Sequence, residues 1–144
     1  MDYRRISDEY TEIGHDLINT MPELAELKNA DVQIIFLASE HVKKHGGGIV
    51  FGQCEKVPDK YKWGIPCDFT ITVFEPNVTN FSPEQMRILL FHELLHVGVF
   101  EDKLYLRNHD LEDFKVIIEK YGVHWSDETG PEFVTSEEIS SDEE

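Results

Sequence analysis

The apolar residues near the start of the chain recur at the spacing of an α-helix. They are Tyr10, Ile13, Leu17, Ile18 and Met21. This spacing predicts a helix over residues 7–20, which stops before Pro22 because proline cannot continue a helix.

Three later apolar runs are too short for helices and are rich in β-branched and aromatic residues. They comprise residues 32–38, 49–54 and 68–75, and together they predict a three-stranded sheet. The first run is continuously apolar, as in a buried central strand. The third alternates, with Thr70 and Thr72 on one side, and this pattern predicts an edge strand with a half-exposed face.

A second predicted helix lies in the most apolar stretch of the chain, residues 86–100. Ser82 can act as its N-cap, Pro83 suits the first helical position, and Gln85 can complete a capping box. A helix that is apolar on all sides is normally buried in a core. We therefore expect this helix to lie inside the domain.

Three polar residues, His92, Glu93 and His96, interrupt this apolar helix, and we expect them to be buried with it. The two histidines are one turn apart, about 40° around the axis, so both imidazoles can reach one metal ion. An unpaired buried polar group costs roughly 2–7 kcal/mol, which favours a divalent cation as the partner of this trio. The HExxH pattern predicts a zinc site with two imidazole ligands and a carboxylate that acts on water. The alternative is a pair of core histidines whose hydrogen bonds are satisfied within the protein.

A catalytic zinc site takes three protein ligands and leaves the fourth position to water. His109, 13 residues after the motif, begins the last predicted helix, residues 109–121, and a loop over residues 101–107 can return this helix end to the metal. We expect His109 to be the third ligand, with Asp110 or Asp113 as replacements. Either aspartate can otherwise orient a ligand histidine through its second ring N–H, or cap the helix.

Two other classes of zinc peptidase place the third ligand differently. One uses the position of Asp102 after a glycine turn, but Val99 occupies the place where that class needs glycine. The other uses a glutamate followed four residues later by aspartate, and Glu112 is followed there by Val116. His109 therefore remains the expected ligand.

These residues predict a zinc-dependent metallopeptidase that hydrolyses peptide bonds with a water activated by the metal. Glu93 is expected to take a proton from this water and pass it to the leaving amine. Tyr105 and His124 are candidates for stabilising the oxyanion. The substrate is a peptide or protein, which we expect to pair antiparallel with the edge strand predicted over residues 68–75.

Charge divides the chain into two parts. Its 144 residues suit one domain, and half of the formal net charge of −16 lies in residues 126–144, which contain eight acids and no base. We therefore expect a domain over residues 1–125 and an acidic, disordered tail over residues 126–144.

Several classes of function are not expected. Lys and Arg form no cluster denser than pairs such as Lys43-Lys44, which argues against binding to nucleic acid. No run of 18 apolar residues and no export signal is visible, so we expect a cytoplasmic protein without a membrane span. Cys54 and Cys67 form no CxxC pair and are expected to be free thiols.

Several segments of the chain occur, in the same order, in one family of small proteins. They are residues 52–63 with their Lys-Val-Pro-Asp-Lys-Tyr core, residues 68–71, the HExxH motif at 92–96, a His-Asp-x-x-Asp-Phe sequence at 109–114, and residues 121–125. Over roughly residues 32–125 the chain resembles the putative phage metallopeptidase family, zincin-like proteins found mostly in phages and prophages.

The resemblance implies both a fold and a site. The fold is a small zincin-like α+β domain, in which the three-stranded sheet packs on the active-site helix together with N- and C-terminal helices. Zinc is held by His92, His96 and His109, and Glu93 is the catalytic acid and base. The resemblance also implies a phage or prophage origin, and hence the cytoplasm of an infected or lysogenic bacterial host.

Two further hypotheses belong to other classes of protein. The first is a metal-stabilised, catalytically inactive phage protein that binds a host protein through its acidic surface. It predicts that Glu93→Gln keeps biological function, whereas His92→Ala destroys folding. The second is an acidic DNA mimic that antagonises a nucleic-acid-binding protein of the host, and function retained after deletion of the tail would contradict it.

Overall fold

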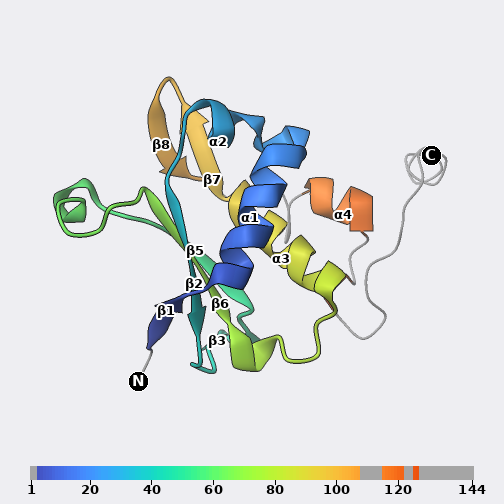
Figure 1. Ribbon diagram of the computed structural model, residues 1–144. Coiled ribbons are helices and arrows are strands. Elements are labelled where there is room, and N and C mark those ends of the chain that lie inside the picture. Colours follow the sequence, from blue (N-terminus) through green and yellow to red (C-terminus); the bar gives the residue numbers. More distant parts are fainter. Residues whose placement is uncertain (1–2, 108–114, 122–124, 127–144) are drawn as a thin grey trace.

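The computed structural model describes residues 3–107, 115–121 and 125–126 (Figure 1). The chain is of the α+β class. Its helices and strands, in order, are β1 (Arg4–Ile6), α1 (Asp8–Thr20), α2 (Ala25–Asn29), β2 (Ile34–Ser39), β3 (Lys44–His45), β4 (Gly48–Ile49), β5 (Gly52–Lys56), β6 (Phe69–Phe74), α3 (Pro83–Leu95), β7 (Val97–Phe100), β8 (Lys103–Leu106) and α4 (Lys115–Tyr121), with short 3-10 turns at Pro22–Leu24, Asp59–Tyr61 and Glu75–Asn77.

The main sheet of the described residues has four strands in the order β1-β2-β6-β5 (Figure 1). β2 and β6 are parallel, whereas β1 pairs antiparallel with β2, and β5 pairs antiparallel with β6. The three predicted strands are present, and the short β1 adds a fourth. The sheet is therefore mixed, with β1 and β5 at its edges.

The prediction that residues 68–75 form an edge strand was wrong. β6 lies between β2 and β5, and Thr72 has no exposed surface. The polar side of this strand is covered because Arg4 donates hydrogen bonds to Thr72 Oγ1 at 2.9 Å and to Glu55 Oε1 at 2.8 Å. A buried threonine with a hydrogen-bond partner avoids the cost of an unpaired hydroxyl. Among the described strands, the edge nearest α3 is instead β5.

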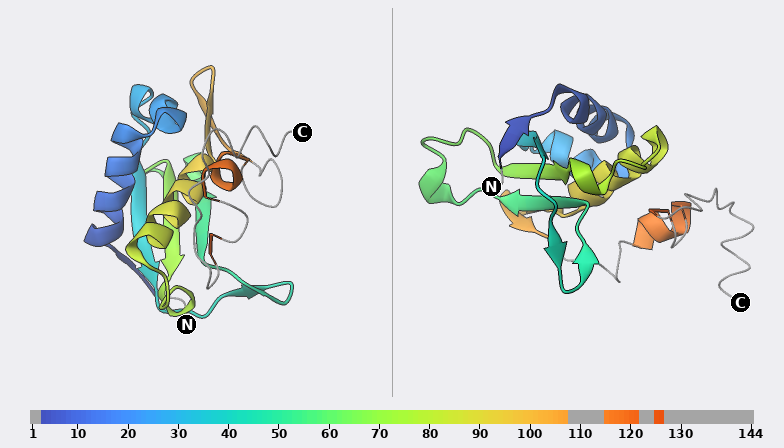
Figure 2. Two further views of the ribbon diagram at one scale, coloured as in Figure 1. Left: turned by 90° about the vertical axis from the view of Figure 1, so that its right-hand side faces the viewer. Right: turned by 90° about the horizontal axis from the view of Figure 1, so that it is seen from below.

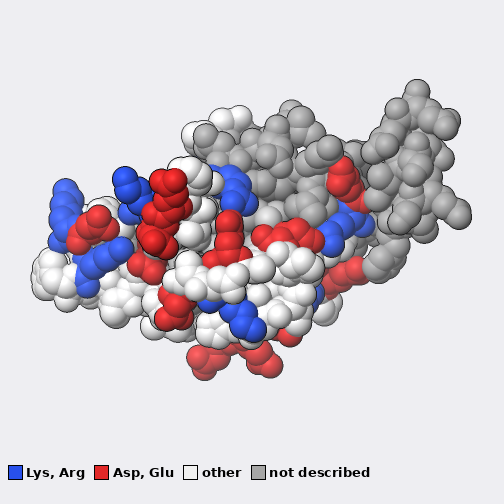
Figure 3. Space-filling model, turned by 90° about the horizontal axis from the view of Figure 1, so that it is seen from above, with Lys and Arg blue, Asp and Glu red and all other residues white. Residues whose placement is uncertain are grey.

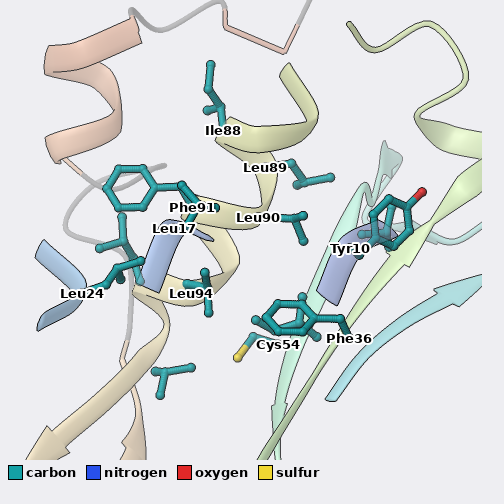
Figure 4. Close-up of a cluster of buried hydrophobic side chains, with 14 of the residues drawn as sticks. Tyr10, Leu17, Leu24, Phe36, Cys54, Ile88, Leu89, Leu90, Phe91 and Leu94 are labelled. Carbon is teal, nitrogen blue, oxygen red and sulfur yellow. The ribbon is translucent and has the colours of Figure 1, made fainter. Parts of the chain in front are cut away.

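Helices α1 and α3 pack together on one face of the sheet (Figures 1 and 2). α1 begins after the N-cap Ser7, and α3 begins after Ser82, which forms the predicted capping box with Gln85. α1 lies so close to the sheet that a Cβ on Gly14 would stand 2.2 Å from the Phe36 ring. Leu17 of α1 and Leu90 and Leu94 of α3 belong to one cluster of buried side chains in the core (Figure 4).

The loop predicted over residues 101–107 is instead part of the β7–β8 hairpin. Glu101 and Asp102 form its turn, with φ of 48° and 65°, the left-handed geometry of a two-residue hairpin turn. Neither is glycine or asparagine, so the usual sequence signal of this turn is missing. Helix α3 accordingly ends at Leu95, before the end of the apolar stretch from which it was predicted.

Other predictions concern the ends of the chain and the cysteines. The described part of the last helix is α4, and its predicted beginning at His109 lies outside the described residues. The predicted tail, residues 126–144, also lies outside them apart from Ser126.

Cys54 and Cys67 are buried free thiols, as predicted. None of the described helices has the length and apolar character needed to cross a membrane.

Candidate metal centre and active site

His92, Glu93 and His96 lie together at the C-terminal end of α3. The helix is regular to Leu95 and His96 is its C-cap. The two imidazole rings are 5.3 Å apart between centroids, with their planes at 66°. Both histidines are partly exposed, whereas Glu93 is only 4% exposed. The expectation of a buried trio is therefore correct for Glu93 alone, because the helix ends here.

The Glu93 carboxylate packs against the edge strand. A Cβ added to Gly52, the first residue of β5, would stand 3.2 Å from Glu93 Oε2 and 3.2 Å from the carbonyl oxygen of Thr72. Glycine is the residue that permits this close approach of a side chain to the backbone. The carboxylate thus lies against the backbone of an edge strand.

Cys54 lies on the same face of β5 as Gly52, two residues further along. Burial raises the pKa of its thiol, and the negative charge of Glu93 raises it further. The thiolate is the form that binds metals and attacks electrophiles. Cys54 is therefore held as a neutral thiol beside the site, where it contributes packing.

His96 is held in one orientation by the β7–β8 hairpin. The hairpin brings Arg107 back to His96, whose Nδ1 lies 2.7 Å from the Arg107 carbonyl oxygen. A carbonyl only accepts hydrogen bonds, so Nδ1 carries the proton and the lone pair of the neutral ring is on Nε2. The Arg107 backbone N–H also donates to the His96 carbonyl. The ring is therefore prepared to bind a cation through Nε2.

Arg107 is itself anchored from another part of the fold. Its guanidinium is 2.7 Å from Glu26 Oε1 on α2. The Tyr105 ring lies against Gly98, where a Cβ would stand 2.3 Å from the ring. The packing of the Tyr105 ring on Gly98 thus holds the two strands of the hairpin together. His124, the other candidate for the oxyanion, lies outside the described residues.

We expect Glu26→Gln to weaken metal binding about tenfold, because loss of a partner that orients a ligand histidine costs 10–100-fold in affinity. The measurement is the zinc dissociation constant by competition with a chromophoric chelator. Asp16→Asn is the matched control, since it removes the 2.6 Å ion pair between Asp16 and Arg87, which also reaches α3. Equal zinc affinities of Glu26→Gln and wild type would show that the ion pair between Glu26 and Arg107 does not help to position the Arg107 carbonyl.

The third ligand predicted from the sequence, His109, lies outside the described residues, as do Asp110, Glu112 and Asp113. Asp102 is exposed at the turn of the β7–β8 hairpin. Within residues 3–107, 115–121 and 125–126, no three His, Cys, Asp or Glu side chains gather where they could hold a metal. Asp102 therefore does not complete a site with the two histidines of α3.

The chemistry of the described donors suits two positions of a metal site. Two imidazoles one helical turn apart are common zinc ligands. A histidine that binds a metal through one ring nitrogen usually donates a hydrogen bond from the other, as His96 does from Nδ1 to the Arg107 carbonyl. The described residues thus offer two candidate ligands and a carboxylate.

Trp125 completes the surroundings of the motif, a role that the sequence did not reveal. Its ring centroid is 6.4 Å from that of His92, and its backbone carbonyl accepts a 3.0 Å hydrogen bond from Gln85 Nε2. It lines a cavity of about 130 Å³ beside the motif, together with Phe51, Gly52, Leu89, His92 and Glu93. The only signal for Trp125 in the sequence was its place in the segment over residues 121–125.

The architecture is that of an α+β domain whose HExxH helix packs against the edge strand of a mixed sheet. Comparison of the sequence with protein families gives a match over residues 2–133 to the family described as Putative phage metallopeptidase, and the chain belongs to this family. No curated protein and no solved structure matches it. The matched region includes β1 and α1, which precede the segments on which the resemblance was based. A metallopeptidase family implies a metal ion and a protein or peptide substrate.

Proposed function

We propose that the protein is a zinc-dependent metallopeptidase, in which His92, His96 and His109 hold the metal and Glu93 is the general base. The observation that carries this proposal is the position of Glu93, a buried carboxylate that packs against the backbone of β5 and lines one cavity together with His92. Zinc, when bound, polarises a carbonyl and makes water acidic enough to lose a proton near neutral pH.

Each side chain of the site has a distinct role in this proposal. Glu93 accepts a proton from the attacking water and donates it to the departing amine, so the carboxylate is restored after each turnover. The packing of Gly52 against Glu93 limits how far the carboxylate can move. The hydrogen bond of His96 to the Arg107 carbonyl places the lone pair of the neutral ring on Nε2, the atom that would donate to the cation. Orientation of these groups before the substrate arrives is a large part of catalysis.

The substrate is a peptide in extended conformation that pairs antiparallel with an edge strand. The strand that the sequence predicts for this pairing, residues 68–75, lies inside the sheet. The strand that fits is β5, because it is at the edge of the sheet and its first residue touches Glu93. Main-chain hydrogen bonds to such an edge hold a peptide without regard to most of its side chains. The phage family supports a place of action inside an infected or lysogenic bacterial cell.

The first experiment is to measure metal content by mass spectrometry for wild type and His109→Ala. We expect about one zinc per wild-type chain and a clear loss in the variant, because a site with two protein ligands binds zinc weakly. His41→Ala is the matched control, since His41 and His45 are also four residues apart but are exposed. Wild type that takes up no zinc even after reconstitution would contradict the proposal.

A second candidate function is supported by the charge of the protein. The formal net charge is −16, and acidic side chains gather over the middle of the face seen from above in Figure 3. In this candidate the metal stabilises the fold, and the acidic surface binds a host protein. Zinc binding without hydrolysis of any peptide in a large mixture would favour this candidate over the peptidase.

A further inference from the structure

The cavity beside Glu93 has an apolar character that the catalytic chemistry does not require. Three of its walls are the side chains of Phe51, Leu89 and Trp125, and its volume is about 130 Å³. Gly52 and Glu93 border it on the side of the proposed reaction. We call this cavity, to which these five residues and His92 contribute among the described residues, the Trp125 pocket. An apolar pocket that adjoins a reacting carboxylate is placed to receive part of the substrate.

The walls of the Trp125 pocket are held by contacts on their outer side. Phe81 packs between two of them, with its ring 5.0 Å from Phe51 and 6.3 Å from Trp125. Trp125 is further fixed by the hydrogen bond of its carbonyl to Gln85, and Leu89 is 2% exposed within α3. Because these contacts hold the walls in place before a ligand binds, binding costs little conformational entropy of the protein.

The volume limits which side chains can enter. An apolar cavity of about 150 Å³ binds benzene, so a pocket of about 130 Å³ accepts a branched aliphatic side chain or, at most, a phenyl ring. An indole is too large. A charged side chain would lose its hydration against three apolar walls, which is unfavourable. The pocket therefore suits leucine, isoleucine, valine, methionine and phenylalanine.

The direction of β5 assigns this side chain to one side of the cleaved bond. β5 runs from Gly52 to Lys56, so an antiparallel peptide runs from the Lys56 end towards the Gly52 end. Glu93 touches Gly52, and Phe51 of the pocket lies one residue beyond it. We propose that the Trp125 pocket binds the side chain of the residue that follows the cleaved bond, and that it selects an apolar residue no larger than phenylalanine. This inference rests on the proposed peptidase function.

The test begins with zinc-loaded, full-length protein and a mixture of peptides of random sequence, with the cleavage sites read by mass spectrometry. We expect cleavage before aliphatic residues or phenylalanine at least about tenfold more often than before alanine or aspartate, as an apolar pocket discriminates on this scale. Cleavage without this preference, or with the preference on the amino side of the bond, would overturn the inference.

Variants of Phe51 then change the size of the pocket. Phe51 is partly buried and packs at the margin of the core. Phe51→Ala is expected to admit tryptophan after the cleaved bond, whereas Phe51→Trp is expected to shift the preference to valine and alanine. Phe100→Ala is the matched control, because Phe100 is 66% exposed on the hairpin. The same preference in all four proteins would contradict the assignment.

A binding measurement separates this inference from the proposed function. The protein has two tryptophans, so in the double variant Glu93→Gln, Trp63→Phe the tryptophan fluorescence, excited at a wavelength where tyrosine does not absorb, comes from Trp125 alone. We expect titration with the amide of Ala-Ala-Leu-Ala to change this fluorescence at concentrations at least tenfold lower than titration with the amide of Ala-Ala-Asp-Ala. If the variant binds the leucine peptide selectively but wild type hydrolyses no peptide, the assignment of the Trp125 pocket is kept and the peptidase function is refuted. If wild type hydrolyses peptides but the variant does not bind selectively, the peptidase function is kept and the assignment of the pocket is refuted.

Discussion

Glu93→Gln is expected to lower kcat/KM for peptide hydrolysis by about 10²–10⁴-fold while zinc content stays at the wild-type level. Glutamine has nearly the same shape as glutamate, so it can fill the space between α3 and Gly52 without displacing the histidines. An amide cannot take a proton from water, and the general-base step is therefore lost. The measurements are steady-state kinetics on a fluorogenic peptide taken from the cleavage mixture, and zinc content by mass spectrometry.

The control for removal of one negative charge is Glu75→Gln. Glu75 lies outside the motif, where it accepts a hydrogen bond from Tyr10 and pairs with Arg5, so hydrolysis should be unchanged. Full activity of Glu93→Gln would refute the mechanism. If the variant loses hydrolysis but still supports phage function in infected cells, the biological role is the binding function and not the peptidase.

Local sequence signals predicted the part of the site that is carried by one helix. Ser82 and Gln85 satisfy each other's backbone groups within one turn, which is why the start of α3 could be located from the sequence. The spacing of His92 and His96 then fixed their common side. These contacts join residues three or four positions apart, and such pairs depend on helical geometry alone.

The supports of the site could not be predicted because they join distant residues. The burial of Thr72 depends on Arg4, 68 residues away, and the pocket depends on Gln85 and Trp125, 40 residues apart. The orientation of His96 depends on a hairpin whose turn lacks glycine and asparagine. Polarity along one segment says nothing about a partner elsewhere in the chain, so β6 was assigned to an edge. The sequence thus located the candidate donors on α3 but not the contacts that orient them.

Gly52→Val is expected to reduce hydrolysis by about 10²-fold, because misplacement of a catalytic group by about 1 Å has an effect of this size. Even a Cβ would stand 3.2 Å from both Glu93 Oε2 and the Thr72 carbonyl oxygen, and the two methyl groups of valine need more room. The strand is held by its pairing with β6, so the Glu93 side chain is the group that moves. Gly52→Ala should show a smaller loss of activity, since Glu93 has to move by only a few tenths of an ångström to make room for one Cβ.

The chain offers a matched control for this series at Gly64, where an added Cβ would have no heavy atom within 4 Å. Gly64→Val should retain full activity. Thermal denaturation and zinc content, measured on the same samples, separate a displaced carboxylate from a damaged fold, and both should stay close to wild type in Gly52→Ala. If Gly52→Val is as active as Gly64→Val, then the approach of Glu93 to the edge strand has no part in catalysis, and the position of the carboxylate relative to the two imidazoles is sufficient by itself.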